Sequence, residues 1–169
     1  MFARAGTWLG VDGDTLGAVG VTSRALTVVR ATMPLRVTAL HHVALPVSDL
    51  ERSRRFYREV MGLAEIERPP AFDFRGAWFA LGDGQLHLIE RKGGTVRVDK
   101  PVDSRDVHFA VRVDDFDATL AHLRAAGYRD DLPADDPLWL KWNRTPNAGF
   151  PQIFILDPDR HVIELNAAG

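Results

Sequence analysis

Two stretches of the chain are near copies of one another: HVALPVSDL at residues 42–50 and HFAVRVDDF at residues 108–116. Their histidines, His42 and His108, are 108 − 42 = 66 residues apart, and the aspartate seven residues after each histidine keeps the same offset. Each stretch alternates like a strand and then reaches an acidic residue that suits the start of a helix. The sequence therefore predicts a strand–helix unit that occurs twice.

Strand-like segments follow each predicted helix, and Gly62 and Gly127 are placed to end the two helices. The order βαβββ thus occurs twice. One such unit alone would leave a sheet face bare, so we expect an α+β fold in which two βαβββ modules pack side by side and form a shared cupped mixed sheet. The expected strands are residues 39–47, 63–68, 74–82 and 85–91 in the first module and 106–113, 128–132, 150–156 and 161–166 in the second.

The chain divides into four segments by composition and pattern. Residues 1–34 are rich in Gly, Ala, Val and Thr, show no helical or strand period, and contain acids that argue against a signal or transit peptide. We expect this segment to be a poorly ordered extension, or to result from an upstream start of translation, with Met33 as the working start. The first module is then residues 35–92, a linker is residues 93–104, and the second module is residues 105–169.

Composition limits the function. The chain has 169 residues, of which 46% are hydrophobic, and a net charge of −2 with dispersed cations, so a nucleic-acid surface is not expected. No apolar run approaches the roughly 20 residues that span a bilayer. There is no cysteine, so any metal must be held by His, Asp, Glu or Gln, which favour Zn, Ni, Mn, Fe or Co over Cu(I). We expect a cytoplasmic protein with a small-molecule substrate and no membrane partner.

Strand alternation selects four possible metal ligands. Successive side chains of a strand point to opposite faces, so a polar residue between apolar neighbours lies on the face opposite to them. A lone histidine in such a place is more often a hydrogen-bonded core residue, but a buried unpaired glutamate is unfavourable, and four residues at equivalent places favour one shared site. The four, from the first and last strands of the two modules, are His42, His87, His108 and Glu164.

The chain from about residue 38 to 167 resembles the vicinal oxygen chelate superfamily, which includes glyoxalase I, extradiol dioxygenases, methylmalonyl-CoA epimerase and the fosfomycin and bleomycin resistance proteins. The resemblance implies the glyoxalase-like fold of paired βαβββ modules with a divalent metal in the cleft. The stretches that carry it are HVALPV at 42–47, DLERSRRFYREVMGL at 49–63 and DPDRHVIEL at 157–165.

The resemblance also implies how the metal is held. Ligands are expected at His42, His108 and Glu164, and a fourth often comes from the position of His87, where glyoxalase I commonly has Glu and the epimerase has Gln. A metal with open positions stabilises negative charge on two chelated oxygens, or brings O2 to a chelated diol. Glu164 is the one inward acid found, so it would serve in turn as ligand and catalytic base, or solvent or substrate would help.

Residues 138–144, LWLKWNR, are long and aromatic for a simple turn. They are interpreted either as a lid or wall over the cleft, with basic side chains that meet a substrate carboxylate, or as a surface loop packed on the sheet or on a partner subunit. Arg112 shares the strand parity of His108 and is a further pocket residue. The candidate substrate-binding residues are Arg112, Trp139, Lys141, Trp142 and Arg144.

The leading hypothesis is a metal-dependent enzyme of the glyoxalase type, a lyase or isomerase acting on a small substrate that chelates the metal through vicinal oxygens. One alternative is an extradiol-type ring-cleaving dioxygenase, because two histidines and a carboxylate support Fe(II) chemistry. Another is a metal-free binding or resistance protein that holds a small molecule in the same cleft. A homodimer is expected, with the modules paired within one chain or exchanged between two.

Overall fold

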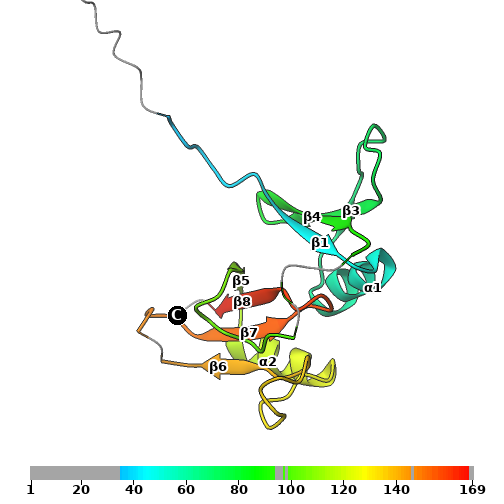
Figure 1. Ribbon diagram of the computed structural model, residues 1–169. Helices are drawn as coiled ribbons and strands as arrows, with labels where there is room; N and C mark the ends of the chain where they lie inside the picture. Colours follow the sequence, from blue (N-terminus) through cyan, green and yellow to red (C-terminus); the bar gives the residue numbers. More distant parts are fainter. Residues whose placement is uncertain (1–34, 94–96, 98, 146, 168–169) are drawn as a thin grey trace, which may run out of the picture. The chain divides into compact units, whose positions relative to one another are not determined.

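The computed structural model divides the chain into two compact units, residues 1–37 and residues 38–169, and the helices and strands of the described residues lie in the second. The predicted N-terminal extension, residues 1–34, lies outside the described residues. No helix in the described part of the chain is long and apolar enough to cross a membrane. The structure describes residues 35–93, 97, 99–145 and 147–167 (Figure 1).

The first module forms a four-stranded mixed sheet in the order β1-β4-β3-β2, with β1 parallel to β4 and the other neighbours antiparallel. Its helix changes from α-helical to π-helical geometry at Phe56. The elements are β1 (His42–Val47), α1 (Leu50–Arg55), η1 (Phe56–Val60), β2 (Glu65–Ile66), β3 (Gly76–Leu81) and β4 (Gly84–Glu90).

The second module repeats this topology in the order β5-β8-β7-β6, with β5 parallel to β8. The predicted α+β fold of two βαβββ modules is confirmed. Among the described residues the shared sheet takes the form of two four-stranded sheets, in which β1 and β5 are edge strands. The elements are β5 (His108–Val113), α2 (Phe116–Ala125), β6 (Lys141–Asn143), β7 (Gln152–Leu156) and β8 (Val162–Ala167).

The duplicated aspartates begin the two helices as the sequence predicts. Asp49 Oδ1 accepts the backbone N–H of Arg52 at 3.0 Å, and Asp115 Oδ1 accepts that of Ala118 at 2.7 Å. Both aspartates have extended backbone angles and so occupy the N-cap position. Each carboxylate satisfies a backbone donor that the first helical turn leaves without a partner.

Part of the segment 138–144 forms a strand that the sequence did not predict. Lys141–Asn143 is β6, an edge strand that pairs antiparallel with β7, and the strand expected at 128–132 is reduced to an isolated bridge between Arg129 and Trp139. A strand of three polar and aromatic residues is too short to show a period of two. Its pairing is set by contact with β7, which local sequence does not reveal.

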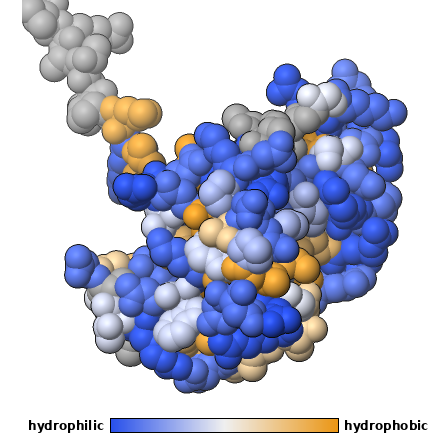
Figure 2. All heavy atoms as spheres, turned by 60° about the horizontal axis from the view of Figure 1, so that its bottom comes forward, coloured by the Kyte–Doolittle hydropathy of each residue, from blue (hydrophilic) through white to orange (hydrophobic). Residues whose placement is uncertain are grey.

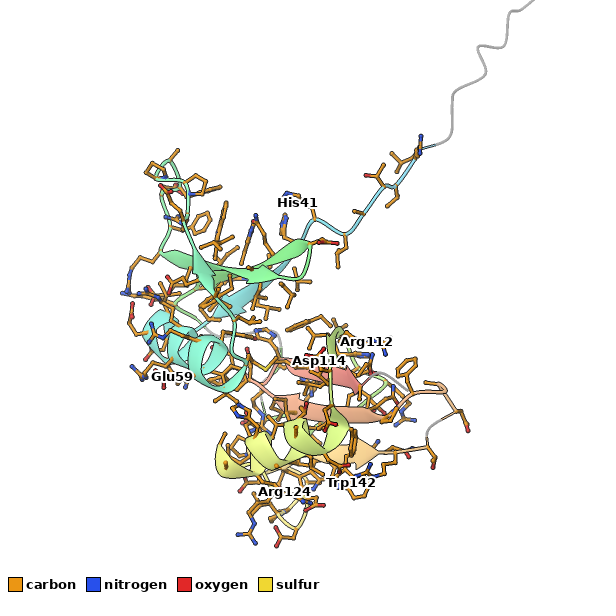
Figure 3. All side chains as sticks on the ribbon, turned by 180° about the vertical axis from the view of Figure 1, so that it is seen from behind. His41, Glu59, Arg112, Asp114, Arg124 and Trp142 are labelled. Carbon is orange, nitrogen blue, oxygen red and sulfur yellow. The ribbon has the colours of Figure 1, made fainter. Side chains whose placement is uncertain are left out.

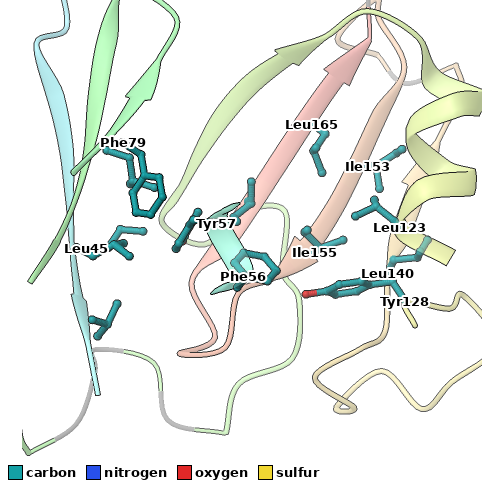
Figure 4. Packing of buried hydrophobic residues seen from close by; sticks show 14 of the residues in the cluster. Leu45, Phe56, Tyr57, Phe79, Leu123, Tyr128, Leu140, Ile153, Ile155 and Leu165 are labelled. Atoms are coloured by element: carbon teal, nitrogen blue, oxygen red, sulfur yellow. The ribbon is translucent and has the colours of Figure 1, made fainter. Parts of the chain in front are cut away.

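One cluster of buried apolar side chains contains residues of both modules. Leu45 and Phe79 from the first sheet, Tyr57 from η1, and Ile155 and Leu165 from the second sheet all belong to it (Figure 4). These residues occupy the alternating positions opposite the predicted ligands, so the strand parity of the sequence analysis is correct. Elsewhere the face seen in Figure 2 is mainly hydrophilic, with apolar atoms gathered near its centre.

Buried polar contacts also join the modules, at the turn between β7 and β8. The Tyr57 hydroxyl donates to Asp157 Oδ2 at 2.7 Å, and Asp157 Oδ1 accepts the backbone N–H groups of Asp159 and His161. Asp159 accepts from the backbone N–H and hydroxyl of Ser48 and from the Ser53 hydroxyl. Residues at the start of α1 and in η1 of the first module therefore donate hydrogen bonds to carboxylates of the second module.

Burial raises the pKa of Asp157, although the nearby His161 and the Tyr57 hydroxyl act in the opposite direction. Burial also raises the pKa of Tyr57 well above its ordinary value. The neighbouring Asp157 carboxyl raises the pKa further, because its negative charge would repel a phenolate. Tyr57 is therefore a neutral donor in this contact. A buried acidic group that keeps three hydrogen-bond donors is a strong constraint on the position of the turn.

We expect Tyr57→Phe to lower the free energy of unfolding by about 2 kcal/mol, because it leaves a buried acidic oxygen without its donor. The matched control is Tyr128→Phe, which removes a buried hydroxyl that donates to the backbone carbonyl of Leu156 inside the second module at 2.6 Å. That neutral hydrogen bond contributes about 1 kcal/mol. Urea denaturation measures both. Equal losses in the two variants would contradict the special weight given to the contact between modules.

The pH dependence of stability should differ between the wild type and Asp157→Asn. Because the pKa of Asp157 is raised from its ordinary value of 3.8, the folded protein binds this proton more tightly than the unfolded chain. The stabilising contribution of the group is therefore present at low pH and is lost as the pH rises through the raised pKa. Asparagine keeps the acceptor for the two backbone donors and does not ionise. Asp157→Asn should gain stability relative to the wild type between pH 4 and pH 7 in urea denaturation, and a constant difference would argue against the raised pKa.

Candidate metal centre

The structure brings the four predicted ligands together as two pairs, one in each module. His42 and His87 lie on the neighbouring strands β1 and β4, with ring centroids 4.3 Å apart and planes nearly parallel at 14°. His108 Nε2 lies 2.9 Å from Glu164 Oε2, between the neighbouring strands β5 and β8. Among the described residues, no group of three or more His, Cys, Asp or Glu side chains is arranged to hold a metal ion.

The pair in the second module is in direct contact, and a second hydrogen bond orients the His108 ring. His108 Nδ1 lies 2.7 Å from the Asp106 carbonyl oxygen, which can only accept, so Nδ1 carries the proton of this hydrogen bond. In the neutral ring Nε2 then has a lone pair that faces the Glu164 carboxylate. Two acceptors at 2.9 Å need a proton between them, on Nε2 or on the carboxyl group, or a cation that both bind.

Glu164 is nearly buried, with 6% of its surface exposed. Its Oε1 accepts a hydrogen bond from the side-chain amide of Gln152 on β7. The carboxylate is therefore held on one side by an amide and on the other by an imidazole. Gln152 was not selected from the sequence, because its place beside Glu164 depends on the β7–β8 register, in which Phe154 lies opposite Glu164.

The pair in the first module is oriented in a similar way. His87 Nε2 lies 2.8 Å from Gln85 Oε1, so Nε2 donates and Nδ1 keeps a lone pair. His42 Nδ1 lies 2.9 Å from His41 Nδ1, which leaves His42 Nε2 without a hydrogen-bond partner in the described part of the chain. Gln85 precedes His87 by two residues and therefore lies on the same face of the strand. The alternation of the sequence alone could have identified Gln85.

Electrostatics favour the neutral form of His87. Burial lowers the pKa of His87, and repulsion from the neighbouring His42 and His41 lowers it further. A neutral imidazole is the form that binds a metal ion, since the protonated ring has no lone pair to give. The residue types, the orientation of each ring and the absence of cysteine thus fit a divalent metal with nitrogen and oxygen ligands.

The candidate substrate residues separate into two groups. Lys141 lies opposite Phe154 in the β6–β7 register and therefore shares the Glu164 face, and Trp139 packs beside the buried cluster of Phe154, Leu156 and Val162. Arg112 from β5 and His42 from β1 line the same cavity of about 350 Å³. These three residues remain candidates for contact with a substrate.

Trp142 lies on the side of the second sheet that faces α2 (Figure 3), and Arg144 contacts Phe116 of α2. The Trp142 ring meets Phe116 edge to face at 6.1 Å, and its Nε1 donates to Asp130 at 2.7 Å. Arg144 stacks over Phe116 and pairs with Asp117. Within the chain, the structure does not bring these two side chains to either ligand pair.

A larger cavity of about 470 Å³ lies away from both ligand pairs. It is lined by the end of η1, including Val60 and Met61, and by Asp115, Ala118 and His122 at α2. His122 Nε2 contacts the Val60 carbonyl oxygen at 2.8 Å, which accounts for this histidine as a structural residue. Size alone therefore does not identify the site. The oriented histidines and the buried glutamate make the ligand pairs the candidate site.

Two curated relatives are similar to this chain. One is "Probable lactoylglutathione lyase" from Vibrio parahaemolyticus, 32% identical over 127 residues that cover 73% of this chain and 86% of that protein. The other is "Glyoxylase I 4" from Arabidopsis thaliana, 40% identical over 57 residues, which cover 33% of this chain and only 32% of that protein.

Solved structures share the fold at lower identity. A glyoxalase family protein from Bacillus anthracis is 20% identical, with a TM-score of 0.63 over 81% of this chain and 100% of that chain. The fosfomycin resistance protein FosX from Listeria monocytogenes, a variant complexed with Mn(II) and 1S,2S-dihydroxypropylphosphonic acid, is 18% identical, with a TM-score of 0.59 over 79% of this chain and 95% of that chain.

The family model described as Glyoxalase/Bleomycin resistance protein/Dioxygenase superfamily matches residues 39–165. This range contains both modules and all four predicted ligands, as the resemblance in the sequence implied. The duplicated βαβββ topology and the relatives point to the same family. The chain is a member of the glyoxalase, bleomycin resistance and dioxygenase superfamily, the vicinal oxygen chelate superfamily.

Proposed function

We propose that the protein is a divalent-metal-dependent enzyme of the glyoxalase type, a lyase or isomerase that acts on a small substrate with two neighbouring oxygens. The observation that carries the proposal is the His108–Glu164 pair, in which Nε2 faces the carboxylate at 2.9 Å while Nδ1 is engaged elsewhere. The 32% identity with a lactoylglutathione lyase favours this chemistry over ring cleavage.

His42, His87, His108 and Glu164 would hold the metal ion. When bound, such an ion stabilises the negative charge that develops on a chelated substrate oxygen. Zn, Ni, Mn, Fe and Co all suit a set of imidazole and carboxylate donors. The related FosX structure contains Mn(II), which supports a divalent metal in this fold without identifying the one used here.

Glu164 is the residue proposed to move the proton. It is the acidic side chain of the ligand set, and a glyoxalase-type isomerisation takes a proton from a carbon beside a carbonyl group and returns it to the next carbon. The Gln152 amide donates to Oε1 and the His108 ring contacts Oε2, so both carboxylate oxygens are positioned. Arg112 and Lys141 are proposed to meet anionic groups of the substrate, and Trp139 to line the same side.

We further propose that the centre is completed in a homodimer, where the ligand pair of one copy meets the other pair of its partner. Within one chain the pairs stay on separate four-stranded sheets. The edge strands β1 and β5 each carry one of the histidines, and each is preceded by an exposed apolar residue: Leu40 is 76% exposed and Val107 is 87% exposed. Unpaired edges and exposed apolar side chains are features that a second copy can cover.

A complementation experiment tests both proposals. The first variant carries His42→Ala and His87→Ala, the second carries His108→Ala and Glu164→Gln, and each alone should lose metal binding because every centre lacks one pair. The two are given different affinity tags, refolded together, and the mixed dimer is purified. If centres form between copies, one of the two centres in this dimer has all four ligands.

We expect the mixed dimer to bind a single Zn or Ni ion, measured by elemental analysis, and to convert the hemithioacetal of methylglyoxal and glutathione at about half of the wild-type rate. A control mixture of each variant with itself should remain inactive. A mixed dimer that binds no metal and has no activity would contradict the proposal that each centre forms between two copies. A wild-type protein that takes up no divalent metal would reject the enzyme proposal itself.

A further inference from the structure

A stack of three rings crosses the first sheet at the ligand pair. The Trp78 ring from β3 lies parallel to the His87 ring, with centroids 3.9 Å apart and planes at 7°. The His87 ring is stacked in turn on His42 at 4.3 Å. Trp78 and His87 are direct partners in the β3–β4 register, so the strand ladder itself sets this stack. An aromatic surface therefore begins one ring away from the proposed metal ligands.

The aromatic surface continues into the loop between β2 and β3. Phe72 meets the Trp78 ring at 5.5 Å and the Phe74 ring at 5.2 Å. Phe72 is 41% exposed although it is a large apolar residue. We call Phe72, Phe74 and Trp78 the aromatic wall. It runs from the solvent-exposed loop to the imidazole of His87.

The loop is held in place by Arg68. Its guanidinium lies over both phenyl rings, with Cζ 5.1 Å from the Phe72 centroid and 4.9 Å from the Phe74 centroid, and it also donates to the backbone carbonyls of both residues. At Gly76 an added Cβ would lie 2.5 Å from the Leu88 carbonyl oxygen and 3.5 Å from the Phe74 ring. The absence of a side chain there permits the close approach of the loop to the sheet.

The duplication supplies an internal comparison for this surface. Trp78 is the ladder partner of His87, and Phe154 is the ladder partner of the equivalent Glu164. Phe154 is only 4% exposed, because it packs in a cluster with Val102 of the linker and with Leu156 and Val162 of its own module. The wall in the first module keeps Phe72 exposed instead. An aromatic group beside a ligand pair is thus covered by the chain in one module and left open in the other.

We propose that the aromatic wall is a substrate subsite, which binds an aromatic substituent of a substrate whose vicinal oxygens meet the metal at His87. This inference rests on the proposed function and specifies its substrate class: aryl-substituted 2-hydroxy or 2-oxo compounds. The ring stack places the wall within one ring contact of a metal ligand, so the substituent is attached directly beside the chelating oxygens. Arg68 Nη2 donates to two loop carbonyls and its guanidinium lies over two rings, whereas Arg68 Nε is buried without a hydrogen-bond partner among the described residues. The wall presents aromatic faces, so planar apolar groups are the substituents that it suits.

Hydroxamates test the subsite without turnover, because they chelate a metal through two neighbouring oxygens. Benzohydroxamate and acetohydroxamate are titrated into the Zn-loaded wild-type protein and into Phe72→Ala, and the ratio of their dissociation constants is compared. We expect Phe72→Ala to reduce the preference for benzohydroxamate by about 3- to 10-fold, the range of one aromatic pair. The ratio cancels any change in metal affinity that the two ligands share.

The matched control is Leu138→Ala, which removes an apolar side chain of equal exposure, 41%, from the second module. It should leave the ratio unchanged. A ratio that Phe72→Ala does not alter, on protein that has bound Zn, would overturn the subsite and leave the proposed function intact.

Failure to bind any of Zn, Ni, Mn, Fe and Co would overturn the proposed function, and the subsite is then tested in the metal-free protein. Benzamide, which does not chelate in this way, is titrated while the indole N–H resonance of Trp78 is followed, with Trp78→Phe for its assignment. A shift that Phe72→Ala reduces supports the aromatic subsite. No shift in the wild-type protein overturns it.

Discussion

The arrangement of the two modules depends on the buried carboxylates of the turn between β7 and β8. A buried acidic group is tolerated only when its hydrogen-bonding oxygens have donors, and the second module supplies only part of them here. The Tyr57 hydroxyl and the hydroxyls of Ser48 and Ser53 in the first module supply the others. The turn and the start of the first helix must therefore stay together, and the apolar faces of both sheets are held in one core.

This constraint determines what remains available for function. With the apolar faces engaged, the opposite face of each sheet carries a ligand pair, and the edges of β1 and β5 stay unpaired. Each pair is already oriented by contacts within its own module: the Asp106 carbonyl and the Gln152 amide at one, and the Gln85 amide at the other. The proposed site is thus built as two rigid halves, and assembly requires only that the halves meet.

The duplicated modules differ in the residues beside their candidate ligand pairs, where a substrate would make contact. The same ladder position beside a ligand is aromatic in both, as Trp78 and Phe154. In the second module the Phe154 ring is part of a buried apolar cluster. In the first module the Trp78 ring contacts the exposed Phe72, whose loop is held in place by Arg68. Two copies of one motif therefore place a pair of candidate ligands at equivalent positions, two histidines in one module and a histidine with a glutamate in the other. The surroundings of the two pairs differ, which gives the proposed cleft an apolar side.

Much of this architecture could be predicted from local pattern. The repeat of 66 residues between His42 and His108 indicated the duplication, and strand parity selected His87 and Glu164 for the same faces. The same alternation also predicts that Gln85, two residues before His87, lies on the His87 face. Gln152 was not predictable in this way, since its position beside Glu164 depends on the register between two strands. The short strand β6 and the position of Trp142 toward α2 also depend on pairing with β7.

The sequence by itself determined which side chains share a face, because the alternation of a strand is a local property of its backbone with a period of two. It also determined where both helices begin, because Asp49 and Asp115 satisfy backbone donors only three residues away. Only the tertiary structure decided that the four ligands form two pairs rather than one group. That outcome depends on how two modules approach each other, and the approach is set by buried contacts between residues about 100 positions apart, such as Tyr57 and Asp157.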